Sequence, residues 1–245
     1  MIYNFNTRPY IVINGKDSRE IPGLIICSLP PITLPPVRNL IETVDGRDGD
    51  IITTLGYEAY DKVIEIGLAK EYNVDDIISY FATSGEIVFG NEPDKYYIFT
   101  NLQPINFERL LRMKKASVTL HIQPFKYAED EDVRSIVYTQ YGGSKRFEVR
   151  NSGNIFSRPK ISIKASGDVN LGINDTVVLS IAFPYTDDTI TIDSEAFEAY
   201  YSNGEYANRR VSGNYDNIKL IPGYNSILIQ GAVKKIEISK TSRWL

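Results

Sequence analysis

The densest group of side chains that could do chemistry lies in the segment Glu42–Tyr57, which reads ETVDGRDGDIITTLGY. Its charged and turn-forming residues are Asp45, Gly46, Arg47, Asp48, Gly49 and Asp50. Closely spaced carboxylates bind calcium in EF-hand loops, which also need a glycine at the sixth position and a glutamate at the twelfth. With Gly49 as that glycine, Val44 falls at the first position and Leu55 at the twelfth. The EF-hand pattern therefore fails, and an irregular calcium site stays open as an alternative.

The same segment is better explained as a sharp reversal of the chain. Glycine takes positive φ without a Cβ clash, so Gly46 and Gly49 favour tight turns between the flanking apolar runs. We expect Arg47, which stands between carboxylates, to lock this turn. A contact of Arg47 with a neighbouring subunit is the second interpretation.

No other pattern predicts catalysis or a bound cofactor. The single histidine, His121, lies on the polar phase of a predicted strand, and one histidine without cysteine ligands does not build a usual zinc site. The chain has no G-x-S-x-G elbow, no G-x-x-x-x-G-K-[ST] loop and no G-x-G-x-x-G motif. The single cysteine, Cys27, lies in an apolar run and is predicted to be a buried small hydrophobe. We therefore expect no catalytic residues, no metal and no cofactor.

Carbohydrate chemistry is harder to exclude, because the paired carboxylates of glycosidases can lie far apart in sequence. The segment Phe197–Tyr206, FEAYYSNGEY, carries aromatic side chains that could stack on sugar rings. Tyrosines of a β-rich protein are more often core or rim residues. A sugar-binding module is thus the second functional interpretation, and a carbohydrate-active enzyme is a distant third.

Length and charge indicate two domains. A chain of 245 residues with 42% hydrophobic content is long enough for two cores. Residues 1–132 carry 13 Lys and Arg against 20 Asp and Glu, whereas residues 133–245 carry 14 against 11. The acidic run Glu129–Asp132 separates these halves. We therefore predict domains at 1–132 and 133–245, joined by an exposed acidic linker.

The composition also limits the partners. A formal net charge of −4 argues against general nucleic-acid binding. Basic clusters at Arg112–Lys115, Arg209–Arg210 and Lys234–Lys235 are interpreted as solvated surface that could pair with acidic partners. The opening residues, MIYNFNTRPY, do not resemble a signal peptide, and no apolar stretch approaches about 18 residues, so we expect no membrane span. One cysteine excludes a disulfide within the chain and suits synthesis in a reducing cytoplasm.

The first half is predicted to be mainly β with one helix. Strands are expected at Tyr10–Asn14, Leu24–Ser28, Ile51–Tyr57, Lys62–Leu68, Gly85–Phe89, Tyr96–Thr100 and Ala116–Pro124. The helix is expected at Val74–Thr83, with Asn73 or Asp75 as its cap. Its predicted buried stripe consists of Val74, Ile77, Ile78 and Phe81. The proline-rich segment Pro30–Pro36 must follow a sheet edge or project outward, because proline lacks a ladder donor.

The second half is predicted to be an antiparallel β-sandwich. Its strands begin in Arg134–Gln140 and continue at Phe147–Arg150, Pro159–Lys164, Val177–Ala182, Thr189–Asp193, Lys219–Leu220, Ser226–Gln230 and Lys235–Ser239. Six or seven short strands separated by Gly, Asn and Asp turns, with no convincing helix, are typical of a sandwich.

Several of these motifs occur in an order that resembles one family. An aromatic start at Tyr3–Phe5 precedes the VDGRDGD phrase at Val44–Asp50, and the first half closes on the P-F-K-Y phrase at Pro124–Tyr127. The second half opens with an Asn–Gly turn at Asn151–Asn154 and a proline-led strand at Ser157–Ile161. Together they resemble the distal tail (Dit) proteins of long-tailed bacteriophages, and the resemblance covers nearly the whole chain.

The resemblance implies a fold and a role. It implies a ring-forming N-terminal domain, sandwich-like or split-barrel-like with one helix, and a galectin-like C-terminal sandwich. Such proteins form a homo-hexameric ring between the tail tube and the tail-associated lysin or spike, and often carry receptor-binding proteins at the rim. DNA passes through the central channel without specific binding, and we expect part of the first domain's acidic excess to line it. The implied protein is a non-enzymatic virion component of the tail tip.

Overall fold

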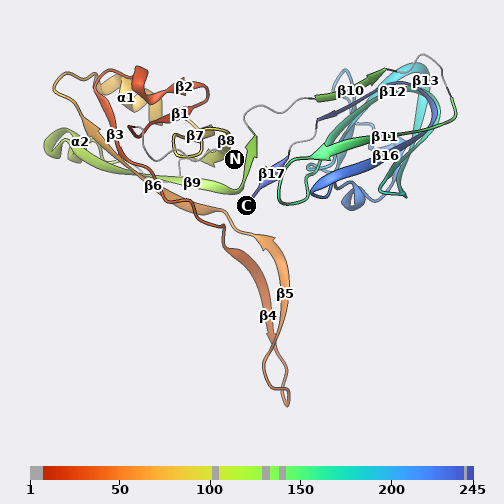
Figure 1. Ribbon diagram of the computed structural model, residues 1–245, viewed down its shortest axis with the longest axis horizontal. Helices are drawn as coiled ribbons and strands as arrows, with labels where there is room; N and C mark the ends of the chain where they lie inside the picture. The colour runs from red at the N-terminus through yellow and green to blue at the C-terminus, as the bar shows by residue number, and fades with distance from the viewer. Residues whose placement is uncertain (1–7, 101–104, 129–132, 138–141, 240–241) are drawn as a thin grey trace. The chain divides into compact units, whose positions relative to one another are not determined.

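The computed structural model describes residues 8–100, 105–128, 133–137, 142–239 and 242–245. The chain forms two compact units, Met1–Glu129 with Leu245, and Asp130–Trp244 (Figure 1). Each unit has its own cluster of buried apolar side chains. The expected linker Glu129–Asp132 and the aromatic start Tyr3–Phe5 lie outside the described residues. The chain is mainly β, as the sequence predicts.

Seven strands of the first unit form one antiparallel sheet in the order β2-β1-β7-β8-β9-β6-β3. They are β1 (Ile11–Ile13), β2 (Lys16–Asp17), β3 (Leu24–Ser28), β6 (Tyr60–Leu68), β7 (Gly85–Phe89), β8 (Lys95–Thr100) and β9 (Lys115–Ala128). Alternate side chains point inward, so Ile64 of β6 lies opposite Val118 of β9, and both are fully buried. A 3-10 turn, η1 (Ser18–Glu20), follows β2.

Helix α1 (Val74–Phe81) begins at the predicted cap, because the Asn73 side chain accepts a hydrogen bond from the second helical amide. Its buried face differs from the prediction at two of the four positions. Val74 is only half-buried. Ile78 is exposed, and Tyr80 is buried in its place. The Tyr80 hydroxyl can be buried because it donates a hydrogen bond to the Ile11 carbonyl oxygen at 3.1 Å.

A second helix, α2 (Phe107–Met113), corrects the expectation of a single helix. The Asn106 side chain caps it by accepting from the Arg109 amide at 2.8 Å, and the helix stops at Lys114, which has a φ of +57°. Seven residues with one buried side chain, Leu110, are too few to show a helical repeat in the sequence.

Two other expectations for the first unit need correction. Cys27 is partly exposed rather than buried, because the inward phase of β3 is occupied by Leu24 and Ile26, and Cys27 lies on the opposite phase. Strand β4 (Val37–Thr43), which pairs with β5 (Asp50–Tyr57), is not predicted. All seven β4 residues are exposed, so no alternation of apolar and polar side chains marks the strand.

The second unit is built on a single antiparallel sheet in the order β10-β16-β12-β13-β14, with β11 also on β16 and β15 also on β13. Its strands are β10 (Val133–Val137), β11 (Ser144–Asn151), β12 (Lys160–Ile173), β13 (Thr176–Asp193), β14 (Glu198–Tyr201), β15 (Val211–Gly213) and β16 (Gly223–Ser239). Two 3-10 turns are η2 (Asn208–Arg210) and η3 (Tyr215–Asn217), and a short strand, β17 (Arg243–Trp244), follows β16.

Strands expected to be separate are joined in the structure. Val177–Ala182 and Thr189–Asp193 are the two ends of β13, and Ser226–Gln230 and Lys235–Ser239 are the two ends of β16. The partner strand β12 changes register at Gly167, whose φ is +69°, and β13 and β16 bend with it. The bends let both halves of each long strand face one core.

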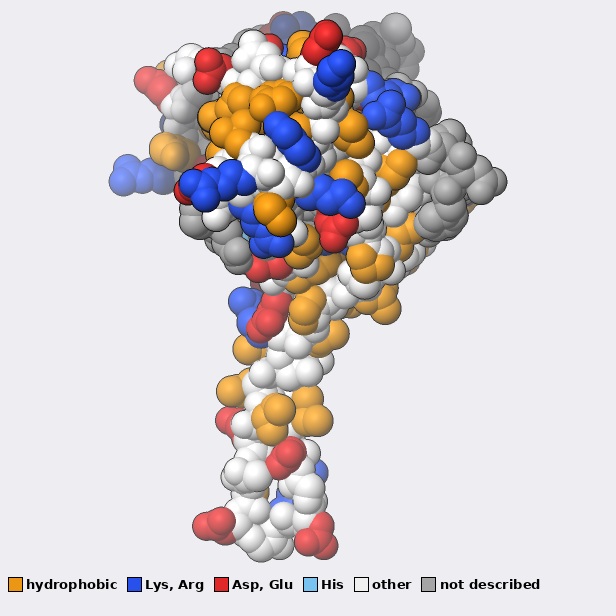
Figure 2. All heavy atoms as spheres, turned by 90° about the vertical axis from the view of Figure 1, so that its left-hand side faces the viewer, with side chains coloured by type: hydrophobic (Ala, Val, Ile, Leu, Met, Phe, Trp, Pro, Cys, Tyr) orange, Lys and Arg blue, Asp and Glu red, His pale blue; other side chains and the backbone are white. Residues whose placement is uncertain are grey.

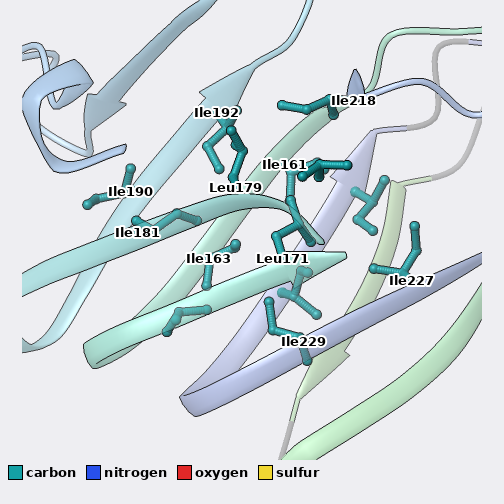
Figure 3. Close-up of a cluster of buried hydrophobic side chains, with 14 of the residues drawn as sticks. Ile161, Ile163, Leu171, Leu179, Ile181, Ile190, Ile192, Ile218, Ile227 and Ile229 are labelled. Carbon is teal, nitrogen blue, oxygen red and sulfur yellow. The ribbon is translucent and has the colours of Figure 1, made fainter. Parts of the chain in front are cut away.

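That core is made largely of isoleucine and other branched side chains that point toward one another from β12, β13 and β16 (Figure 3). The predicted strand Lys219–Leu220 is an isolated bridge between Leu220 and Ser157. The first predicted strand is described only as far as Val137, and residues 138–140 lie outside the described part.

Candidate assembly site

The most exposed element of the first unit is the hairpin of β4 and β5, here called the arm (Figure 1). Its strands pair only with each other, and Ile41 lies opposite Ile52. These two side chains are 60% and 62% exposed, which is unusual for large aliphatic residues. Further apolar side chains exposed on the arm are Val37, Leu40, Val44 and Leu55. A two-stranded hairpin alone is marginally stable in water, so the arm has the properties of a segment that a partner covers.

The six residues singled out in the sequence lie together at the tip of the arm. The Arg47 amide donates a hydrogen bond to the Val44 carbonyl oxygen at 3.1 Å and closes the turn. Gly46 and Gly49 take φ values of +80° and +76°, as a sharp reversal requires. All tip residues are exposed. The turn is thus closed by backbone atoms, and the roles of the Arg47 side chain stay predictions.

The structure also bears on the possibility of a metal site at the arm tip. Within the described residues, no group of three or more His, Cys, Asp and Glu side chains could hold a metal ion. His121 pairs instead with Asp61 on the neighbouring strand, at 2.8 Å from Nδ1 to Oδ1. Neither helix of the described chain is long and apolar enough to cross a membrane.

The proline-rich segment forms the root of the arm and is held by side chains from the sheet. Lys62 Nζ donates to the Pro31 carbonyl oxygen at 2.8 Å, and Asn91 Nδ2 donates to the Pro30 carbonyl oxygen at 3.3 Å. Directly after β5, the Glu58 amide donates to the Pro36 carbonyl oxygen at 2.9 Å. The sequence predicts that this segment follows an edge or projects outward, and here it leads from the body into the projecting arm.

A buried group of charges lies beneath this root. Glu92 is 1% exposed and accepts hydrogen bonds from Lys126 Nζ at 2.8 Å and from the Tyr97 hydroxyl at 2.6 Å. Lys62 is 4% exposed. Its pKa is lowered to about 8, mainly by burial, with the charge of Glu92 opposing the shift and that of Lys126 adding to it. The two carboxylate oxygens of Glu92 thus accept from Lys126 and Tyr97. Lys62 donates instead to the Pro31 carbonyl oxygen at the arm root.

None of these three residues is among the predicted site residues, although the sequence holds a signal for two of them. Lys62 shares the inward phase of β6 with Ile64 and Ile66, and Lys126 shares the inward phase of β9 with Ile122. A lysine on the apolar phase of a strand indicates a buried, partnered ammonium. The carboxylate partner, Glu92, comes from the turn after β7 and has no such signature.

In the second unit, the aromatic segment Phe197–Tyr206 covers β14 and the turn that follows it. The Phe197 ring lies 4.7 Å from the Arg158 guanidinium and is tilted against Tyr215, so part of its surface is covered by the protein. Tyr206 is 71% exposed. Phe197 is 45% exposed, so two aromatic side chains of the stretch that suggested sugar stacking reach the surface.

Over nearly its whole length, the chain is similar in fold to a phage hub protein. The Dit protein of phage SPP1, described as a paradigm of the hub adsorption apparatus in phages that infect Gram-positive bacteria, matches 98% of this chain over 100% of its own. The TM-score is 0.67 and the sequence identity is 16%. The phage P2 baseplate in its activated conformation with Ca gives a weaker likeness, with a TM-score of 0.43, 11% identity and coverage of 94% and 96%. No family model and no curated protein sequence matches the chain.

Proposed function

We propose that this chain is a structural hub protein of a phage tail tip and assembles as a hexameric ring. The observation that carries this proposal is the likeness in fold to SPP1 Dit over nearly the whole length of both chains. The order of the sequence motifs supports the same assignment independently of the fold, from the VDGRDGD phrase at the arm tip to the Asn–Gly turn that opens the second unit.

The surface of the first unit suits ring assembly. A closed ring requires a heterologous interface, in which one patch meets a different patch on the next copy. The arm offers apolar side chains such as Ile41 and Ile52 that no second layer of the described chain covers. Short strands β2 and β3 stand at the two ends of the sheet order, where a neighbour's strand could add.

In this proposal, residues 1–132 form the ring and residues 133–245 form an outward-facing, galectin-like domain. The ring joins the tail tube to the tail-associated lysin or spike, and receptor-binding proteins attach at its rim. The protein acts in the virion tail after synthesis in the host cytoplasm. It has no catalytic residue and needs no cofactor.

The acidic excess of residues 1–132 has a role in the channel. Duplex DNA carries about one negative charge per 1.7 Å, and a cationic wall would hold it by counterion release. An acidic wall repels the phosphates and keeps the duplex sliding. Repulsion is screened beyond about 8 Å at physiological salt, so only wall residues matter. A ring structure whose channel is lined mainly by Lys and Arg would refute this role.

Electron microscopy of the purified full chain, with light scattering for the mass, tests the proposed function. We expect rings with six-fold symmetry and a central channel. A chain that stays monomeric at high concentration and under mild crosslinking would contradict the hub assignment.

A sugar-binding module is the second candidate, and the exposed Tyr206 favours it. Defined glycan binding by a monomeric chain, lost in Tyr206→Ala, would support that function. The packing of Phe197 under Arg158 weakens this candidate, because the guanidinium covers a ring face on which a sugar could stack.

A further inference from the structure

The arm root, residues 30–36, is attached to the body by few bonds. It belongs to no strand, and its one backbone hydrogen bond within the described chain is made to the residue that follows β5. Side chains of the body hold it instead. Lys62 donates to the carbonyl oxygen of Pro31. Asn91 donates to the carbonyl oxygen of Pro30. Release of such side-chain bonds frees the root, and no strand pairing has to break.

The arm beyond the root adds little to this attachment. Its strands pair only with each other, and most of their residues are exposed. Tyr57, at the end of β5, contacts Phe125 of β9 with the ring centres 5.6 Å apart. Figure 2 shows the arm leaving the body as a narrow column. Segments with few buried contacts open at a smaller free-energy cost than a core, so the root and the arm can open locally.

The closed root leaves two buried polar groups short of partners. The Lys62 ammonium can donate three hydrogen bonds, and within the described chain it donates one. The aromatic rings around it, with centres 5.4 to 6.0 Å away, are those of Tyr60, Tyr97 and Phe89. Asn91 Oδ1 is buried and has no hydrogen-bond partner among the described residues. Opening of the root lets water reach both groups, which lowers the cost of opening.

Four charged or titratable side chains of the described chain face Lys62. They are Tyr60 of β6, Tyr97 of β8, Lys126 of β9 and Glu92 of the turn after β7. Burial raises the pKa of Tyr60 to about 12, with the Thr33 side chain of the root opposing the shift. Glu92 is paired with Lys126 at 2.8 Å. This carboxylate therefore already has a cation, and the ammonium of Lys62 is bound through a carbonyl oxygen.

We propose that the arm root is a latch that opens while the rest of the first unit stays folded, and that Lys62 takes up a proton as it opens. In the closed root the pKa of Lys62 is about 8, mainly because the side chain is buried, whereas its ordinary value is 10.5. The open root therefore binds more protons between pH 8 and pH 10.5. Opening becomes easier as the pH falls through this interval, and below about pH 7 it no longer changes with the charge of Lys62.

The latch governs the direction of the arm. While the root is closed, Lys62 and Asn91 fix the point at which the arm leaves the body. Once the root is open, the arm can turn about it. Proline restricts its own backbone and that of the residue before it, so the root moves as a stiff segment. This inference goes beyond the hub function and does not depend on it, because every contact lies within one copy.

Acetylation of Lys62 in the native full-length chain measures the opening. An amine that is 4% exposed can react with an acylating reagent only when the root lifts. Short pulses of N-acetoxysuccinimide, read by mass spectrometry, give the rate at Lys62 relative to that at the exposed Lys70. We expect this ratio to fall about 25-fold from pH 7 to pH 9.5, because the closed root gains stability over that interval. A ratio that stays constant would show that opening takes up no proton, which overturns the proposal.

Variants of the root contacts separate local opening from unfolding of the whole unit. Asn91→Ala removes the bond to Pro30, and we expect the acetylation of Lys62 to become about fivefold faster. Asn39→Ala, at an exposed asparagine of β4, is the matched control and should leave the rate unchanged. Ile64→Val destabilises the core at a fully buried position of β6. It should also leave the rate unchanged, because local opening does not involve the core.

The outcomes separate this inference from the hub function. If Ile64→Val accelerates the acetylation of Lys62 as much as Asn91→Ala does, Lys62 is exposed by unfolding of the whole unit and the latch is wrong. The latch is equally wrong if Asn91→Ala has no effect. Circular dichroism at each pH checks that the chains are folded. Both readouts concern a single copy, so they decide on the latch whether or not the chain forms rings.

Discussion

Lys62 Nζ lies 2.8 Å from the carbonyl oxygen of Pro31, and this bond joins the buried charges of the first unit to the root of the exposed arm. The ammonium also lies 5.4 Å from the ring centres of Tyr60 and Tyr97. A lysine buried in this way is costly, and its ammonium is partnered here by the carbonyl oxygen at the arm root. The core of the first unit and the root of the arm are therefore linked through one side chain.

The lowered pKa of Lys62 makes this site sensitive to pH. Between the folded value of about 8 and the ordinary value of 10.5, the unfolded chain binds a proton here that the folded chain does not. The contribution of Lys62 to the free energy of unfolding therefore rises with pH across this interval. Relative to Lys62→Met, wild type should gain about 2 kcal/mol between pH 7 and pH 9.5 in urea unfolding. Lys70→Met, at an exposed lysine, should show no such change. If wild type and Lys62→Met differ in the free energy of unfolding by the same amount at both pH values, the pKa of Lys62 is not lowered.

Removal of the charge on Glu92 should destabilise the first unit. Glu92→Gln leaves the Lys126 ammonium buried without its carboxylate, although the amide can still accept from the Tyr97 hydroxyl. We expect a loss of about 3 kcal/mol in the free energy of unfolding, measured with denaturant. Glu86→Gln, on the exposed phase of β7, should change it by less than about 0.5 kcal/mol. Similar values for the two variants would show that the buried pair adds no stability.

Chelation should leave the protein unchanged. The tip carboxylates Asp45, Asp48 and Asp50 are exposed and fail the EF-hand pattern, so we expect no stoichiometric calcium or zinc in elemental analysis. The melting temperature should be the same with and without a chelator. A chelator-induced drop of more than a few degrees, absent in Asp48→Asn, would instead place a functional calcium ion at the arm tip.

The second unit should fold alone. Its core forms one cluster with Ile161, Ile190 and Ile236 among the fully buried members, all from within the unit. We expect a fragment of residues 133–245 to be soluble and monomeric, with a cooperative thermal transition by circular dichroism. An aggregated or unfolded fragment would show that the two halves need each other, and that the boundary predicted at Glu129–Asp132 is misplaced.

Features that depend on neighbours along the chain could be predicted from the sequence. The cap of α1 at Asn73 follows from a side chain that reaches an amide two residues away. The tip reversal follows from glycines at Gly46 and Gly49, whose positive φ needs no tertiary contact. The β-rich class follows from alternation within single strands. Each of these signals acts over a few residues, which is why it can be recognised directly.

Features that depend on distant partners emerged only in the folded chain. Strand β4 exists because β5 pairs with it, and nothing in its own exposed side chains reveals it. The long strands β13 and β16 bend as one sheet because register shifts on β12 bring both of their halves over a shared core. Glu92 meets Lys126 across 34 positions, and Lys62 meets Pro31 across 31. Such pairs form only when folding excludes water and burial makes an unpaired charge costly, so the energy that selects them is absent from any short stretch of sequence.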